Sequence, residues 1–66
     1  MKEHDISYVM DKTEDYKICS SCGRLNWYEN DCCVGCGNLG FHKLDKEDIR
    51  QLEKDIKRYN LKVLFV

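Results

Sequence analysis

The chain has 66 residues, of which 35% are charged, and its formal net charge at pH 7 is −1. A chain of this length forms one small domain whose hydrophobic core alone gives little stability, so we expect a further source of stabilisation. The near-neutral charge argues against a general nucleic-acid binder, and no apolar run is long enough to cross a membrane.

The first fifteen residues form an acidic N-terminal segment. Within residues 6–10, Ile6, Tyr8 and Met10 alternate with two other side chains. This period of two predicts a short strand over residues 6–10. The alternative is a frayed end, since chain termini are often poorly ordered.

Residues 16–44 contain two Cys-x-x-Cys-Gly units. The four cysteines of these units are Cys19, Cys22, Cys33 and Cys36. Two residues between paired cysteines form a tight turn that directs both sulfurs to one point, and two such turns are typical of a closed four-thiolate zinc site. Gly23 and Gly37 follow the two pairs and permit the positive φ that closes each turn.

We therefore predict one zinc ion held by Cys19, Cys22, Cys33 and Cys36. Because protein ligands fill all four positions, the site is expected to be structural and not catalytic. Iron is the runner-up metal, since four thiolates also suit a rubredoxin-like centre that carries electrons.

The other cysteine and a nearby histidine are not expected to be ligands. Cys32 is adjacent to Cys33, but only Cys33 keeps the two-residue spacing to Cys36. His42 lies six residues beyond Cys36, in an expected strand. An odd count of five cysteines and the lack of a secretory signal disfavour disulfides and predict a cytoplasmic protein.

The residues between the two cysteine pairs are aromatic and polar. Trp27 and Tyr28 are neighbours in an expected strand, so they point to opposite faces and one of them can cover the metal site. Two interpretations are open: both rings cover a very small core, or together with Arg24 they form a binding surface. Asn26 is expected to brace its loop.

The segment as a whole resembles the short prokaryotic zinc-ribbon domain, and it is also similar to the Ran-binding-protein type of zinc finger. The shared pattern is Cys19-x2-Cys22-Gly23-x2-Asn26-x6-Cys33-x2-Cys36-Gly37. The resemblance covers residues 16–38 and implies two short β-hairpins that clamp one zinc ion.

The functional signatures of the second family are only partly present. Its RNA-reading members stack an aromatic residue that follows the asparagine on guanine, and Trp27 matches this position. Their arginine positions hold Glu29 and Asn30, and a carboxylate repels phosphate. Its ubiquitin-binding members have a Thr-Phe pair where this chain has Gly23 and Arg24. The resemblance therefore implies a fold and a metal, and leaves the function open.

Residues 45–60 are predicted to form a helix. Its apolar residues recur at spacings of three and four and are Ile49, Leu52, Ile56 and Tyr59. Asp45 is a suitable N-cap and Asn60 a suitable C-cap. The apolar stripe either packs on the rest of the domain or forms a partner face.

The last six residues, 61–66, are predicted to form a terminal strand because five of them are apolar. Such a strand must be covered, since an exposed apolar edge aggregates. It can pair with residues 6–10 into a small sheet backed by the helix, or add to the edge of a second copy or of another protein.

These features predict a small metal-stabilised α+β domain over residues 1–66, with a zinc ribbon, a helix and a terminal strand. No pair of acid–base groups indicates an enzyme. We expect an interaction protein that presents residues 45–66 to a protein partner or to a second copy, with no membrane contact. The alternatives are RNA or DNA binding through Trp27, Tyr28 and Arg24, and electron transfer by iron.

Overall fold

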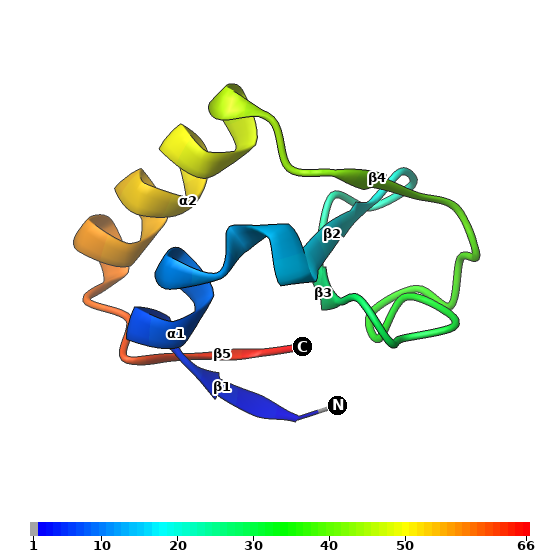
Figure 1. The fold of residues 1–66 in the computed structure, drawn as a ribbon, viewed down its shortest axis with the longest axis horizontal. Helices are drawn as coiled ribbons and strands as arrows, with labels where there is room; N and C mark the ends of the chain where they lie inside the picture. Colours follow the sequence, from blue (N-terminus) through cyan, green and yellow to red (C-terminus); the bar gives the residue numbers. More distant parts are fainter. Residues whose placement is uncertain (1) are drawn as a thin grey trace.

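Residues 2–66, which a computed structural model describes, form an α+β fold with two small sheets (Figure 1). The strands and helices, in chain order, are β1 (Glu3–Asp5), α1 (Ile6–Asp11), the 3₁₀ turn η1 (Thr13–Asp15), β2 (Tyr16–Cys19), β3 (Leu25–Trp27), β4 (Phe41–Lys43), α2 (Lys46–Tyr59) and β5 (Val63–Phe65). The expected helix and terminal strand are confirmed.

The larger sheet has the strand order β3-β2-β4, and it carries the loops that contain the cysteines. β2 pairs antiparallel with both neighbours, with Ile18 opposite Leu25 on one side and opposite His42 on the other. The first cysteine pair therefore lies in a hairpin, as predicted. The expectation of a second hairpin is wrong, because the polar residues 29–31 turn instead of extending and β4 pairs with β2.

The N-terminal segment corrects a second prediction, since residues 6–10 belong to helix α1 and not to a strand. Asp5 caps this helix by accepting a hydrogen bond of 2.8 Å from the Ser7 amide. Ile6, Val9 and Met10 lie on one helical face, and Val9 is fully buried while Ile6 and Met10 are half-buried. The strand prediction was wrong because the alternating pattern placed Val9 on the polar face, whereas Val9 faces the core from α1.

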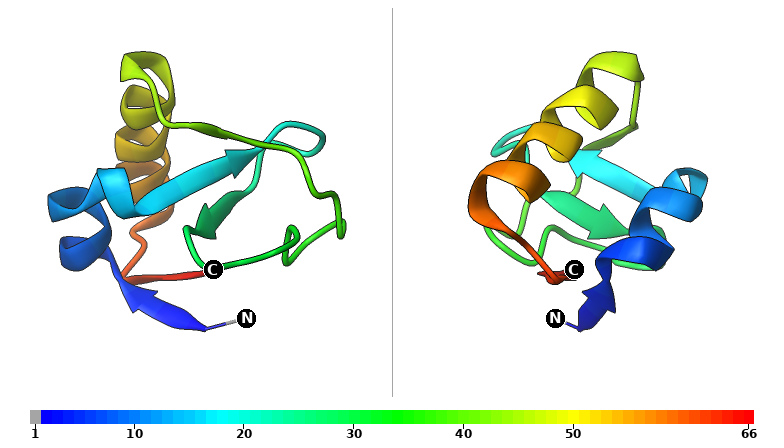
Figure 2. Two further views of the ribbon diagram at one scale, coloured as in Figure 1. Left: turned by 45° about the vertical axis from the view of Figure 1, so that its right-hand side comes forward. Right: turned by 90° about the vertical axis from the view of Figure 1, so that its left-hand side faces the viewer.

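The smaller sheet joins the two ends of the chain. β1 pairs antiparallel with β5, with His4 opposite Leu64, and both views of Figure 2 place these strands next to each other. The predicted pairing of the tail with the N-terminal segment is thus correct in kind, but the partner is residues 3–5 and not 6–10. Within residues 2–66, no further strand pairs with either outer edge of this sheet.

Helix α2 has the predicted caps. The Asp45 carboxylate accepts a hydrogen bond from the Asp48 amide, and the Asp48 carboxylate accepts one from the Asp45 amide. Asn60 ends the helix in the left-handed conformation at φ 51°. The apolar stripe packs partly on the domain, with Leu52 against the core. Tyr59 does not belong to this packed face, because it is 62% exposed.

The apolar core lies where both sheets meet the helices. Its buried residues are Val9, Tyr16 and Val66, and half-buried Leu25, Trp27, Leu44, Leu52 and Leu64 surround them. Burial raises the pKa of Tyr16 to about 12, and its hydroxyl lies 2.7 Å from His4 Nδ1. Among residues 2–66, neither helix is long and apolar enough to cross a membrane.

The C-cap of α2 gives a first testable prediction. Asn60→Ala should lower the free energy of unfolding by about 1 kcal/mol, because an alanine side chain is strained in the left-handed conformation. Asn60→Gly is the matched control and should change it by less than about 0.5 kcal/mol. Urea denaturation followed by circular dichroism measures both values, and equal losses in the two variants would contradict the prediction.

Candidate metal centre

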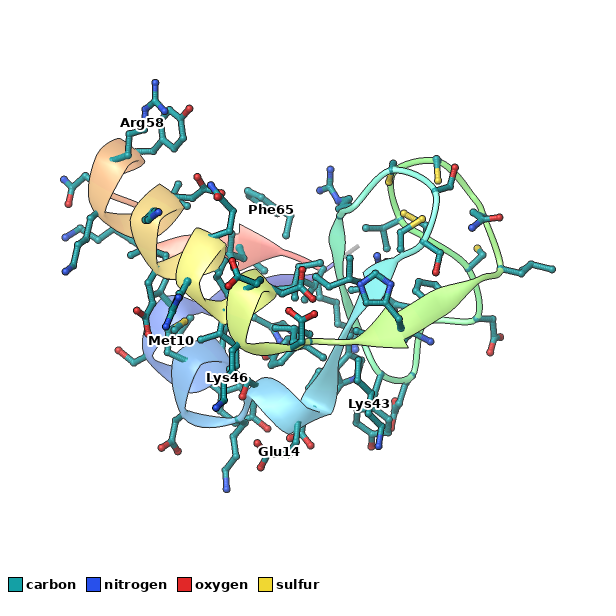
Figure 3. The ribbon with its side chains drawn as sticks, turned by 90° about the horizontal axis from the view of Figure 1, so that it is seen from above. Met10, Glu14, Lys43, Lys46, Arg58 and Phe65 are labelled. Carbon is teal, nitrogen blue, oxygen red and sulfur yellow. The ribbon has the colours of Figure 1, made fainter. Side chains whose placement is uncertain are left out.

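The structure brings Cys19, Cys22, Cys33 and Cys36 together, as the spacing predicted. Their Sγ atoms all lie within 4.8 Å of one another, and the Cys19–Cys36 and Cys22–Cys33 sulfurs are 3.5 Å apart. Figure 3 shows the sulfur atoms between the two loops at the end of the larger sheet. The four side chains are free thiols positioned to bind a metal ion.

Both cysteine turns are built by the same two backbone hydrogen bonds. In the first turn, the Cys19 amide donates to the Arg24 carbonyl over 3.0 Å and the Gly23 amide to the Cys19 carbonyl over 2.9 Å. In the second turn, the Cys33 amide donates to the Asn38 carbonyl over 2.8 Å and the Gly37 amide to the Cys33 carbonyl over 2.9 Å. Both glycines adopt the positive φ that the sequence predicted, 77° and 79°.

The two buried sulfurs accept hydrogen bonds from the turns around them. Cys19 Sγ accepts from the Ser21 and Cys22 amides at 3.4 and 3.5 Å, and Cys33 Sγ accepts from the Gly35 amide at 3.3 Å. These donors favour the thiolate form, which is the form that binds metals. The sulfurs of Cys22 and Cys36 face the solvent side of the cluster, since both residues are exposed.

The thiol pKa values follow from these contacts. The Cys36 amide, followed by that of Gly35, lowers the pKa of Cys33 to about 6, and the Cys22 amide lowers the pKa of Cys19. The Arg24 amide lowers the pKa of Cys22, but hydrogen bonds from Cys33 and Cys36 together with burial raise it to about 12. The contacts therefore favour the thiolate at Cys19 and Cys33 and the thiol at Cys22.

The donor set fits one divalent metal ion that prefers four thiolates. A tetrahedral ion about 2.3 Å from each sulfur requires sulfur–sulfur separations of about 3.8 Å, close to the two observed values of 3.5 Å. A disulfide would require about 2.05 Å. Metal binding would displace the remaining thiol protons and neutralise the mutual repulsion of the thiolates.

Asn26 links the two turns, which confirms that it braces the loop. Its side chain is fully buried, and its Nδ2 donates to the Arg24 carbonyl at 3.0 Å and to Cys33 Sγ at 3.6 Å. Its Oδ1 accepts from the Val34 amide at 3.0 Å and from Asn30 Nδ2 at 3.3 Å. All four hydrogen-bonding positions of the amide are thus used.

Two further asparagines near the cluster were not identified from the sequence. Asn38 Nδ2 lies 3.9 Å from Cys19 Sγ and donates to the Gly40 carbonyl, so it supports the first buried sulfur from the opposite loop. Asn30 donates to Asn26 and to the main-chain oxygen of Val66. The position of Asn38 directly after Gly37 was a usable signal, but nothing in the sequence indicated the contact of Asn30.

The remaining cysteine and the two histidines lie outside the cluster. Cys32 is exposed and does not belong to the group of converging sulfurs. His42 Nε2 lies 3.6 Å from Asp48 Oδ2, at the start of α2, and His4 contacts Tyr16. Among residues 2–66, the four predicted cysteines are the one group of three or more Cys, His, Asp or Glu side chains that could hold a metal ion.

The predicted aromatic surface is only partly exposed. Trp27 lies at the far end of β3 from the cysteines, opposite Tyr16, and packs edge-on against the Tyr16 ring and the His4 ring with centroids 5.3 and 5.0 Å away. Tyr28 is 53% exposed and donates to Glu29. Arg24 lies at the cysteine end of β3 and donates to the Phe65 carbonyl at 3.3 Å. These three residues therefore do not form one continuous surface.

Comparison of the chain with protein-family profiles, curated proteins and solved structures finds no match to any of them. The resemblance to zinc ribbons therefore stays a prediction.

The cluster gives a second testable prediction. Cys22→Ser should abolish stoichiometric metal binding and the cooperative thermal unfolding transition, because it removes one of four ligands of a small domain. Cys32→Ser is the matched control, and it should keep one metal ion per chain and the transition. Metal analysis and calorimetry of both variants test this, and metal loss in Cys32→Ser would show that the ligand set is wrong.

Proposed function

We propose that this chain is a non-enzymatic zinc protein in which residues 16–44 form a zinc-ribbon-like staple for a protein-interaction module. The observation that carries the proposal is the convergence of four thiol sulfurs within 4.8 Å. With four thiolates bound, the ion has no open position for water or a substrate, so its role is structural. Reduced thiols that hold a metal fit the cytoplasm.

The interaction surface we propose is the outer side of β5 and the end of α2. Phe65 and Tyr59 are 52% and 62% exposed, and Figure 3 shows Phe65 on the outer side of β5. The β5 residues that pair with β1 through backbone hydrogen bonds are at even positions, as the bond from the Val66 amide to the Lys2 carbonyl shows. The N–H groups of Val63 and Phe65 therefore point away from β1 and offer an open strand edge.

A cleft beside this edge supports the same surface. Its volume is about 330 Å³, and it lies between β5 and the start of β3. Its lining residues are Arg24, Leu25, Leu61, Val63, Leu64, Phe65 and Val66. An extended segment of a protein partner can enter such a cleft and add a strand to the edge, with main-chain hydrogen bonds giving affinity.

The nucleic-acid alternative receives less support. Stacking on a base requires an open ring face, whereas Trp27 is half-buried and already packs against the rings of His4, Tyr8, Tyr16 and Tyr28. The one guanidinium near this hairpin, that of Arg24, is directed at Phe65. The iron alternative shares its ligand geometry with zinc, so metal analysis distinguishes the two.

Native mass spectrometry of the protein as expressed, without added metal, tests the metal proposal. We expect one zinc ion per chain and a colourless protein. An iron ion with visible charge-transfer bands would replace the proposal by electron transfer. A protein without metal would overturn it.

Phe65 gives a prediction about the proposed surface. Phe65→Ser should change the free energy of unfolding by less than about 0.5 kcal/mol, because the ring is largely exposed. It should weaken binding of a partner, or self-association, by about tenfold or more. Leu39→Ser is the matched control, since Leu39 is 75% exposed on the distant second loop.

Sedimentation measures self-association of Phe65→Ser and Leu39→Ser, and affinity measurements give their binding of a partner. Equal binding by wild type, Phe65→Ser and Leu39→Ser would exclude this surface.

A further inference from the structure

Two side chains of the cysteine loops hold the main chain of β5. Asn30, between the two cysteine pairs, donates from Nδ2 to the main-chain oxygen of Val66. Arg24, directly after the first cysteine turn, donates from Nη2 to the Phe65 carbonyl at 3.3 Å. The terminal strand is therefore attached to the cysteine loops as well as to β1.

The attachment through Asn30 leads directly to a sulfur of the metal centre. The second hydrogen of the Asn30 amide goes to Asn26 Oδ1 at 3.3 Å, and Asn26 Nδ2 donates to Cys33 Sγ at 3.6 Å. Asn26 also holds the Val34 amide, next to Cys33, at 3.0 Å. A continuous chain of hydrogen bonds thus connects one metal-binding sulfur to the end of β5.

β5 needs these contacts because its own sheet is small. The sheet has two strands of three residues each, and a two-stranded sheet is marginally stable in water. Val66, directly after β5, is 2% exposed and packs with Val9 and Tyr16, so the end of this segment supplies one of the three buried residues of the apolar core. Release of β5 would open this core as well as the β1 pairing.

The cysteine loops, in turn, depend on the metal. Residues 20–24 and 28–40 contain turns and bends but no helix or strand. Backbone hydrogen bonds shape each turn, and the two turns converge on the cluster of sulfurs. Without a cation, thiolates at 3.5 Å repel each other or stay protonated. Asn26 lies in β3 and Asn30 in the loop that follows, so a bound metal is expected to tighten the position of the Asn30 side chain through Cys33 and Asn26.

We propose that metal binding at the four-cysteine centre fixes β5 against the core through Asn26 and Asn30, with Arg24 as a second contact. The open edge of β5 is then presented only by the metal-loaded protein. The inference rests on the proposed metal binding, and it does not require that the partner is known. It makes the metal a control element of the interaction surface in addition to a staple.

The test uses amide hydrogen exchange of the zinc-loaded full-length chain, read residue by residue by NMR. Asn30→Ala should increase exchange at Leu64 and Val66 by about threefold to tenfold, the factor expected for one net hydrogen bond. Exchange at Ile56 in α2 should stay the same. Asn38→Ala is the matched control, because it removes an asparagine beside Cys19 that does not contact β5.

Zinc affinity provides the second measurement. Coupling between two sites is reciprocal, so Asn30→Ala should weaken zinc binding by the same factor by which it loosens β5. In a chain that also has Val66→Asp, which releases β5 by itself, Asn30→Ala should have a smaller effect on zinc affinity, because only its bond to Asn26 is then lost. An effect as large as in the wild-type background would contradict coupling through β5.

The outcomes separate this inference from the proposed function. Zinc binding by the wild type, with unchanged exchange of β5 in Asn30→Ala, would overturn this inference alone. A wild-type chain that takes up no zinc would overturn both.

Discussion

The convergence of four thiols on one point is the constraint on which the rest of this structure depends. Four sulfurs within 4.8 Å cannot all carry a negative charge unless a cation compensates them. The surrounding amides and the side chains of Asn26 and Asn38 direct positive dipoles at the two buried sulfurs and supply part of this compensation. A divalent ion would supply the remaining positive charge, and one ion would be enough because all four sulfurs belong to a single cluster.

The same strands serve two different kinds of core. At one end of the β2–β3 hairpin, Cys19 and the fully buried Asn26 belong to a polar core. There the side-chain amide of Asn26 makes all four of its possible hydrogen bonds. At the other end, Tyr16 and Trp27 belong to the apolar core. Neither core is large, so neither would stabilise the chain alone, and the rigid hairpin between them lets each one position the other.

The cysteine cluster and the main elements were predictable because they depend on local patterns. The spacing of the cysteines, the positive φ of Gly23 and Gly37 and the capping of α2 involve residues a few positions apart. The errors concern contacts between distant segments. Whether Val9 faced the core depended on β5, and whether the second cysteine turn formed a hairpin depended on β2 as a partner for β4. Asn30 reaches Val66 across 36 positions, and no local pattern indicates such a contact.

β5 shows how these distant contacts shape a surface. Its inner edge pairs with β1, and the Val66 side chain that follows it packs in the apolar core. Arg24 donates to the main-chain oxygen of Phe65, and Asn30 donates to that of Val66. The Phe65 carbonyl points away from β1, so the Arg24 contact occupies part of the outer edge. The contacts of β1, of the apolar core and of Asn30 fix the strand without covering its outer N–H groups. A strand that is held firmly and left open on one edge loses little entropy when it pairs, which is the property that favours tight strand addition. The polar loops around the cysteine cluster thus help to position an apolar strand that is distant from them along the chain.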